Sequence, residues 1–144
     1  MAHPAKRRAT YADVLAAPPH HIAELVDGEL HLQPRPAGPH AVAASGLGID
    51  LGSAFQRGRG GPGGWVFVYE PELHFGDDVL VPDLAGWRAE RVPALDAPYF
   101  TLAPDWACEV LSPRSGRFDR GPKADVYARE GVGYLWLVDP ELHL

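Results

Sequence analysis

The sequence contains one cysteine, two lysines and no asparagine. The single cysteine, Cys108, excludes an internal disulfide framework and a zinc site built from several cysteines. Apolar runs extend for only a few residues, so no segment is long enough to span a bilayer, and no apolar stretch typical of a secretory signal follows the polar N-terminus. Together these absences predict a cytoplasmic protein that does not enter the membrane.

Glycine and proline are abundant instead, with 16 and 15 residues in a chain of 144. Regular structure should therefore be short and often interrupted. The length corresponds to one domain, and we expect a disordered tail over residues 1–9 followed by a single domain over residues 10–144. The formal net charge of −6 excludes a polycation that coats nucleic acid, so any nucleic-acid contact must come from a local basic patch.

The spacing of apolar residues and turn signals predicts an alternation of short helices and strands. Thr10 is expected to cap a short helix that ends before Pro18, and Asp27-Gly28 to turn a hairpin over residues 22–33. The further elements expected are a helix over 40–56, strands over 65–69, 72–75, 79–87 and 105–111, a helix over 121–130 and a strand over 134–138. This order predicts an α/β or α+β fold with a central mixed sheet flanked by helices.

Two carboxylates fall inside apolar strand segments, where an uncompensated charge costs several kcal/mol. They are Asp83, in the segment 79–85, and Glu109, in the segment 106–111. A divalent cation shared by the two side chains would compensate both charges, and oxygen ligands of this kind suit Mg²⁺ or Mn²⁺. The alternative is that each carboxylate pairs with an arginine or caps a turn.

Lys123 follows the Glu109 strand and falls in the expected first turn of the helix over 121–130. Together, Asp83, Glu109 and Lys123 suggest metal-assisted phosphodiester hydrolysis, with the lysine positioning the water or neutralising the developing charge. The segment 114–129 has five basic residues against two acidic ones, a local balance that suits a phosphate backbone. An exposed lysine on a solvated helix face, paired with a neighbouring aspartate, is the alternative.

Several short motifs occur in an order and at a spacing that together are specific. They are Pro82-Asp83, Glu109-Val110-Leu111-Ser112-Pro113, Asp119-x-x-x-Lys123-x-x-x-Tyr127 and Gly131-Val132-x-Tyr134-x-Trp136-x-Val138-Asp139-Pro140, preceded by Glu24-Leu25-Val26-Asp27-Gly28-Glu29-Leu30. This series resembles the Uma-two family of candidate restriction endonucleases, within the PD-(D/E)xK nuclease superfamily. The resemblance extends over nearly the whole chain, and in it His40 opens the helix that follows the hairpin.

The resemblance implies a restriction-endonuclease-like core in which Asp83 and Glu109 bind Mg²⁺ or Mn²⁺. The usual superfamily lysine, two residues after the glutamate, falls on Leu111 here. The lysine would instead come from the next helix, as Lys123. The accessory residues implied are Glu24, His40, Asp119 and Tyr127, which by position alone are equally well a surface acid, a helix-start histidine, a cap residue and a packing aromatic.

The expected activity is therefore metal-dependent endonucleolytic hydrolysis of DNA, and the resemblance also allows a homodimer. A rival interpretation is a catalytically inactive nuclease fold that acts as an interaction or DNA-binding module. The net acidity, Leu111 and the lack of the further strands that family members have after Asp139-Pro140 favour this rival. A third interpretation, a shortened product without a stable fold, follows from the chain length.

Overall fold

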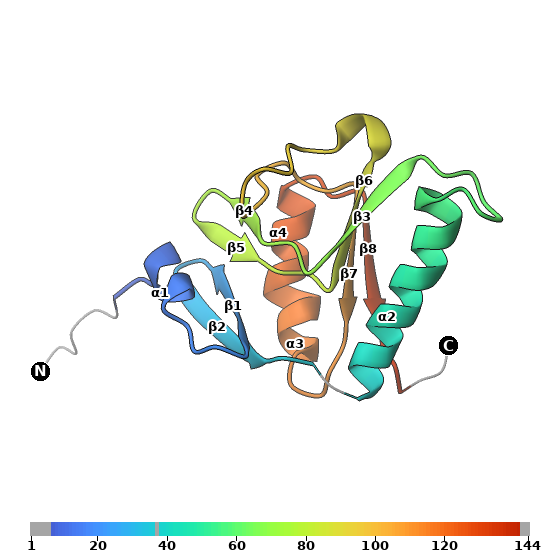
Figure 1. Ribbon diagram of the computed structural model, residues 1–144. Coiled ribbons are helices and arrows are strands. Elements are labelled where there is room, and N and C mark those ends of the chain that lie inside the picture. Colours follow the sequence, from blue (N-terminus) through green and yellow to red (C-terminus); the bar gives the residue numbers. More distant parts are fainter. Residues whose placement is uncertain (1–6, 37, 142–144) are drawn as a thin grey trace, which may run out of the picture.

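The computed structural model describes residues 7–36 and 38–141. Within these ranges, no helix is long and apolar enough to cross a membrane. Figure 1 shows the elements, whose bounds are α1 (Tyr11–Leu15), β1 (His21–Val26), β2 (Glu29–Pro34), α2 (Pro39–Leu51), β3 (Trp65–Tyr69), β4 (Leu73–Phe75), β5 (Asp78–Leu80), β6 (Leu84–Arg88), β7 (Trp106–Val110), α3 (Gly116–Phe118), α4 (Ala124–Arg129) and β8 (Tyr134–Val138). Two π-helical turns, Gly52–Gln56 and Asp119–Lys123, and a 3₁₀ turn, Ala89–Arg91, complete the list.

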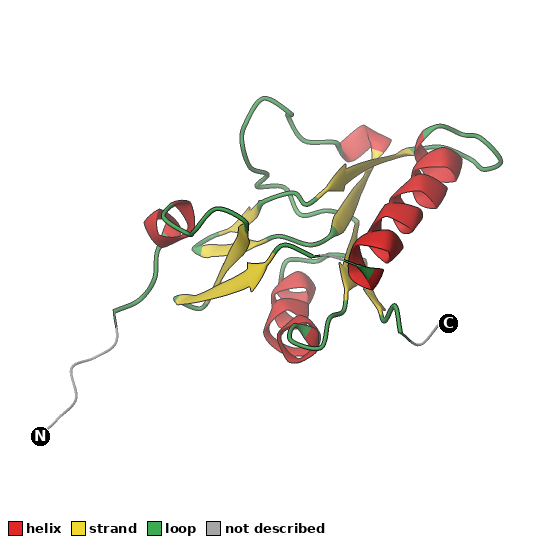
Figure 2. Cartoon of the chain, turned by 60° about the horizontal axis from the view of Figure 1, so that its bottom comes forward, coloured by secondary structure: helices red, strands yellow, loops and turns green. Residues whose placement is uncertain are grey.

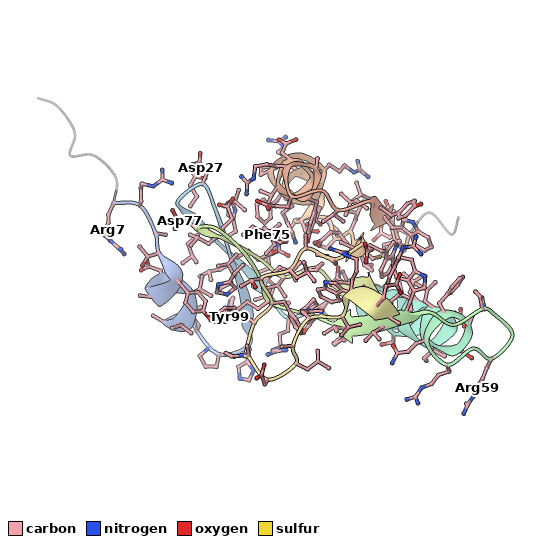
Figure 3. The ribbon with its side chains drawn as sticks, turned by 90° about the horizontal axis from the view of Figure 1, so that it is seen from above. Arg7, Asp27, Arg59, Phe75, Asp77 and Tyr99 are labelled. Atoms are coloured by element: carbon pink, nitrogen blue, oxygen red, sulfur yellow. The ribbon has the colours of Figure 1, made fainter. Side chains whose placement is uncertain are left out.

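The first sheet is antiparallel and has the strand order β2-β1-β5-β4. Its hairpin turns at Asp27 and Gly28, whose φ angles of 49° and 74° lie in the left-handed region that aspartate and glycine tolerate best. The Asp27 amide donates a 2.9 Å hydrogen bond to Asp78 Oδ1, which joins the hairpin tip to the turn between β4 and β5. Figure 3 shows Asp27 and Asp77 at this end of the molecule. The expected hairpin is confirmed.

The second sheet has the order β3-β6-β7-β8 and is mixed, because β7 and β8 run parallel while the other pairs are antiparallel. Its two faces are covered by different helices, α2 on one side and α4 on the other (Figure 2). Trp106, Cys108 and Val110 of β7 pack toward α2, whereas Ala107 packs toward α4. The expected fold class, a mixed sheet flanked by helices, is confirmed.

The alternation along β7 decides where Glu109 points. Because successive side chains of a strand point to opposite faces, Glu109 lies on the Ala107 face, toward α3 and α4. Gly86 of β6 leaves room for the Phe67 ring of β3, since a Cβ atom there would lie only 2.9 Å from that ring. A larger residue at position 86 would displace the ring.

The single strand expected over residues 79–87 is wrong, because the chain forms two strands there. β5 belongs to the first sheet and β6 to the second, and the break falls at Val81-Pro82-Asp83. Proline has no amide hydrogen and cannot donate to a sheet ladder, so a strand interrupts there. The break leaves Asp83 at the junction of the two sheets, directly before β6.

The helix expected over residues 121–130 begins earlier, at Gly116. Pro122 lies inside a π-helical turn rather than in the first turn of the helix. The wider turn accommodates proline, which has no amide hydrogen to donate. Lys123 therefore follows more than one turn of helix and does not oppose the helix dipole at an N-terminus.

In α2, Ala44 and its neighbours face the sheet, whereas Val42 and Ile49 are 73% and 70% exposed. Residues 1–6 of the expected disordered tail lie outside the described residues. The remaining three make contacts: Arg7 pairs with Asp13, Arg8 with Asp27, and the Ala9 amide donates to Gly28 O.

Candidate active site

A cleft of about 620 Å³ lies where the hairpin, the break before β6, the end of β7 and the segment from Ser112 to Lys123 meet. Six of the seven residues singled out in the sequence line it, namely Glu24, His40, Asp83, Glu109, Asp119 and Lys123. The seventh, Tyr127, is buried behind Glu109 and bonds to it. The fold thus gathers residues that are up to about a hundred positions apart in the sequence.

Asp83 is fixed to the end of β7 by two main-chain contacts. Its amide donates to Cys108 O at 3.1 Å, and its Oδ2 accepts a 2.7 Å hydrogen bond from the Val110 amide. The carboxylate therefore lies across the backbone next to Glu109, and both side chains line the same cleft. Asp83 and Glu109 are adjacent through strand pairing, as the two-carboxylate hypothesis requires.

Lys123 is only 1% exposed, and its ammonium lies among three carboxylates. The Nζ atom is 2.6 Å from Glu24 Oε2 and 2.6 Å from Glu109 Oε1, and 3.6 Å from Asp119 Oδ1. The alternative of an exposed, solvated lysine is therefore wrong. A buried charge is tolerated only when it is paired, and here the pairing joins β1, β7 and the helical segment.

Two further donors orient the glutamates. The Tyr127 hydroxyl donates a 2.7 Å hydrogen bond to Glu109 Oε1, and the Val81 amide donates a 2.8 Å hydrogen bond to Glu24 Oε2. The second donor, Val81, lies in the segment between β5 and β6 where Pro82 interrupts the strand. Both carboxylates are consequently held in one orientation inside the cleft.

The electrostatics of this cluster are dominated by excess negative charge. Burial raises the pKa of Glu24, and it raises the pKa of Glu109 well above its ordinary value, against the lowering effect of Lys123. Burial also raises the pKa of Asp119. Burial lowers the pKa of Lys123, but the Glu109, Glu24 and Asp119 carboxylates outweigh it and raise that pKa overall. Lys123 therefore stays charged, and the carboxylates around it hold a proton more tightly than exposed acids do.

His40 lies at the start of α2 and faces Asp83. Its Nε2 atom is 3.4 Å from Asp83 Oδ1. The hydrogen bond with Asp83 raises the pKa of His40, against the lowering effect of burial. His40 is thus a second group of the cleft, besides Lys123, whose charged form is favoured by a neighbouring carboxylate.

The cleft contains oxygen ligands of the kind that a divalent cation requires. Among the described residues, no three histidine, cysteine or acidic side chains form an open metal-binding group. Asp83 and Glu109 do supply two carboxylates at one side of the cleft. Mg²⁺ usually keeps several waters and takes one or two carboxylates together with substrate phosphates, so this pair fits such an ion.

Sequence reasoning missed an aromatic wall of the cleft. The rings of His31 and Phe118 stack with centroids 3.9 Å apart, and Lys123 Nζ lies 5.7 Å from the Phe118 centroid. Burial lowers the pKa of His31. No local pattern announces this stack, because the hairpin and α3 meet only in the folded chain. The main-chain donors of Val81 and Val110 likewise carry no sequence signal.

Four arginines line the cleft or the hollow next to it. Arg35 and Arg114 line the cleft itself, and Arg117 and Arg120 line an adjoining hollow of about 790 Å³. Within the described part of the chain, Arg114, Arg117 and Arg120 form no ion pair with a carboxylate, whereas Arg35 lies 3.8 Å from Glu70. These arginines form a basic rim at the cleft, and its acidic floor consists of Glu24, Asp83, Glu109 and Asp119.

Comparisons with known proteins place this arrangement in context. A sequence model of the family described as "Uma2: Putative restriction endonuclease" matches residues 9–143. Among solved structures, the chain is similar to a putative nuclease belonging to DUF820 from Anabaena variabilis, with 26% sequence identity and a TM-score of 0.77 over 92% of this chain and 74% of that one. A comparison with curated proteins gave no match.

Proposed function

Because this chain belongs to the Uma2 family, described as restriction endonucleases, we propose that it is a divalent-metal-dependent endonuclease that hydrolyses DNA phosphodiester bonds at the cleft. The nuclease assignment has support from the family and from the structural neighbour. Metal dependence and DNA as the substrate are our proposal from the chemistry of the cleft.

One observation carries the proposal: the Lys123 ammonium lies 2.6 Å from Glu109 in the cleft that also holds Asp83. The sequence departs from the superfamily pattern at Leu111, and that departure favoured an inactive fold. The contact supports an active nuclease instead, because Lys123, from the helical segment after β7, pairs with Glu109. Leu111 is apolar and cannot form that pair.

In the proposed reaction, Asp83 and Glu109 would hold the metal ion, and His40 and the Val110 amide would keep Asp83 in place. A divalent ion held there supplies a more acidic water and polarises the scissile phosphate. Lys123 would stabilise negative charge that develops on the phosphate oxygens. Glu24, Asp119 and Tyr127 would act as positioning residues through their contacts with Lys123 and Glu109.

The charge pattern around the cleft favours a nucleic-acid backbone as the substrate, and the family description favours DNA. The floor is acidic and would repel a phosphodiester unless a metal ion is present, while the arginine rim attracts the flanking phosphates. The proposed protein is therefore a nuclease whose substrate binding near the reacting phosphate depends on the ion.

The test is cleavage of supercoiled plasmid DNA with and without Mg²⁺ or Mn²⁺, by the wild type and by Asp83→Asn and Glu109→Gln. Each substitution keeps the side-chain shape and removes the ligand charge. The expected result is metal-dependent cleavage that both variants lose. Asp50→Asn, on the exposed side of α2, is the matched control and should cleave as the wild type does.

Two results would count against the proposal. Cleavage by Asp83→Asn at the wild-type rate would remove Asp83 and its ion from the reaction. DNA binding by the folded wild type without turnover in any divalent metal would favour the rival function, a catalytically inactive DNA-binding module.

A further inference from the structure

Lys123 occupies a position that has the geometry of a cation site. Three carboxylates from β1, β7 and the π-helical turn converge on its Nζ atom, two of them at 2.6 Å and the third at 3.6 Å. The side chain is 1% exposed, so water contributes little to the neutralisation of these acids. The Lys123 ammonium therefore occupies this position as a cation that the chain itself supplies.

Among the described residues, Glu109 and Asp83 each have one carboxylate oxygen without a close donor. Glu109 Oε1 already accepts from both Lys123 and Tyr127, and Asp83 Oδ2 accepts from the Val110 amide. Glu109 Oε2 has no hydrogen bond or ion pair with any residue in 7–36 or 38–141. Asp83 Oδ1 has only the 3.4 Å contact with His40. These two oxygens, one on each of the two carboxylates, are therefore open to an ion.

A second divalent ion has no place beside the first. Paired ions in nucleases and phosphatases lie about 3.5–4 Å apart and share a carboxylate. A second ion shared through Glu109 would lie on its Lys123 side and would need oxygens at about 2.1 Å, where Nζ already stands 2.6 Å from them. The ammonium and a second ion would compete for the same oxygens.

We propose that Lys123 fills one of two cation positions in this centre, so that the protein takes a single divalent ion, between Asp83 and Glu109, and not a pair. The inference rests on the proposed function, because it concerns the same metal centre. Three carboxylates lie around the one ammonium, and Asp83 lines the same cleft, so acidic groups outnumber the lysine. One divalent ion would add positive charge between Asp83 and Glu109, and the lysine supplies its own positive charge without exchanging with solvent.

The test measures how many Mn²⁺ ions the full chain binds, by equilibrium dialysis with metal analysis, alone and with a duplex oligonucleotide. Electron paramagnetic resonance of the bound Mn²⁺ gives an independent readout, since two neighbouring ions couple and a single ion does not. The expected result is one ion per chain and an uncoupled spectrum in both conditions.

Two ions per wild-type chain with a coupled spectrum would overturn the inference and leave the proposed function standing. No ion bound by the folded protein, with or without DNA, would overturn both. The two failures are therefore distinguishable in one experiment.

Lys123→Ala sharpens the test, because it empties the position among Glu24, Glu109 and Asp119. The expected result is a rise from one bound ion to two. Tyr127→Phe is the control: it removes the other donor to Glu109 Oε1 and keeps the ammonium, and it should still bind one ion. A folded Lys123→Ala protein that binds one ion would contradict the inference. If that variant does not fold, the wild-type stoichiometry and spectrum decide.

Discussion

The Tyr127 hydroxyl donates a 2.7 Å hydrogen bond to Glu109 Oε1, and both side chains are buried. Tyr127 lies on α4 and Glu109 on β7, so the bond joins the helix to the strand that carries the central carboxylate of the cleft. Burial, followed by the nearby Glu109 charge, raises the pKa of Tyr127 well above its ordinary value. The hydroxyl therefore keeps its proton, and stays a donor, beyond the pH at which an exposed tyrosine ionises.

Tyr127→Phe removes this donor without changing the ring that packs in the core. A hydrogen bond to a charged group contributes about 1.5–3 kcal/mol, and we expect the free energy of unfolding to fall by about that amount. Urea unfolding of the variant and the wild type measures the difference. Tyr134→Phe on the exposed side of β8 is the control and should change stability by less than about 0.5 kcal/mol. Equal effects of the two substitutions would contradict a special role for the Tyr127 hydroxyl.

Glu109→Gln tests the raised pKa of Glu109 through the pH dependence of stability. A carboxyl whose pKa is higher in the folded state binds its proton more tightly when folded, so wild-type stability from this group rises as the pH falls through the folded pKa toward the ordinary value of 4.5. Glutamine resembles the protonated form at every pH. We therefore expect the stability of Glu109→Gln relative to the wild type to be greatest at neutral pH and above, and to decline toward pH 4.5.

Urea unfolding of both proteins across that range measures the relative stability. Asp50→Asn provides the baseline for removing an exposed carboxylate. A relative stability of Glu109→Gln that stays constant from neutral pH to pH 4.5 would show that the Glu109 pKa is not raised.

Cys108 is expected to be unreactive in the folded protein. It lies in β7 with no exposed surface, and burial raises the pKa of its thiol to about 12. Because the thiolate is the reactive form, an aromatic disulfide reagent at pH 8 should modify it only after denaturation. The matched control combines Cys108→Ala with Ser45→Cys on the exposed side of α2, and that thiol should react at once. Rapid modification of native Cys108 would mean that β7 opens readily.

Arg114→Ala tests the basic rim as a phosphate contact. Arg114 is exposed, lines the cleft and has no carboxylate partner among the described residues. Loss of one phosphate contact should weaken binding to duplex DNA uniformly across sequences and reduce the slope of log K against log salt by about 1. Fluorescence anisotropy in Ca²⁺ at several salt concentrations measures both quantities.

Arg59→Ala is the control for that measurement. Arg59 lies in the glycine-rich loop over residues 57–64, before β3, on the opposite side of the molecule from the hairpin (Figure 3). Its removal should leave the salt slope unchanged. A larger change of the salt slope in Arg59→Ala than in Arg114→Ala would indicate that DNA binds at the loop and not at the cleft.

The sequence by itself determined most of the local structure. The Asp27-Gly28 turn and the apolar strand over residues 106–110 each depend on neighbouring residues, so their patterns are readable along the chain. The motif series also identified the family and, with it, the four accessory candidates, whereas Asp83, Glu109 and Lys123 were already singled out as charged residues in or after apolar strands. Proline marked the places where regular structure changes, although its effect was misjudged at both Pro82 and Pro122.

Only the tertiary structure decided the relation between those residues. Lys123 was as well explained by a solvated helix face as by a site, and its burial depends on β1 and β7, which are distant in the sequence. The stack of His31 on Phe118 and the main-chain donors that hold Asp83 and Glu24 also arise from long-range packing. Burial and charge pairing depend on what surrounds a side chain in space, and a linear pattern describes only its neighbours along the chain.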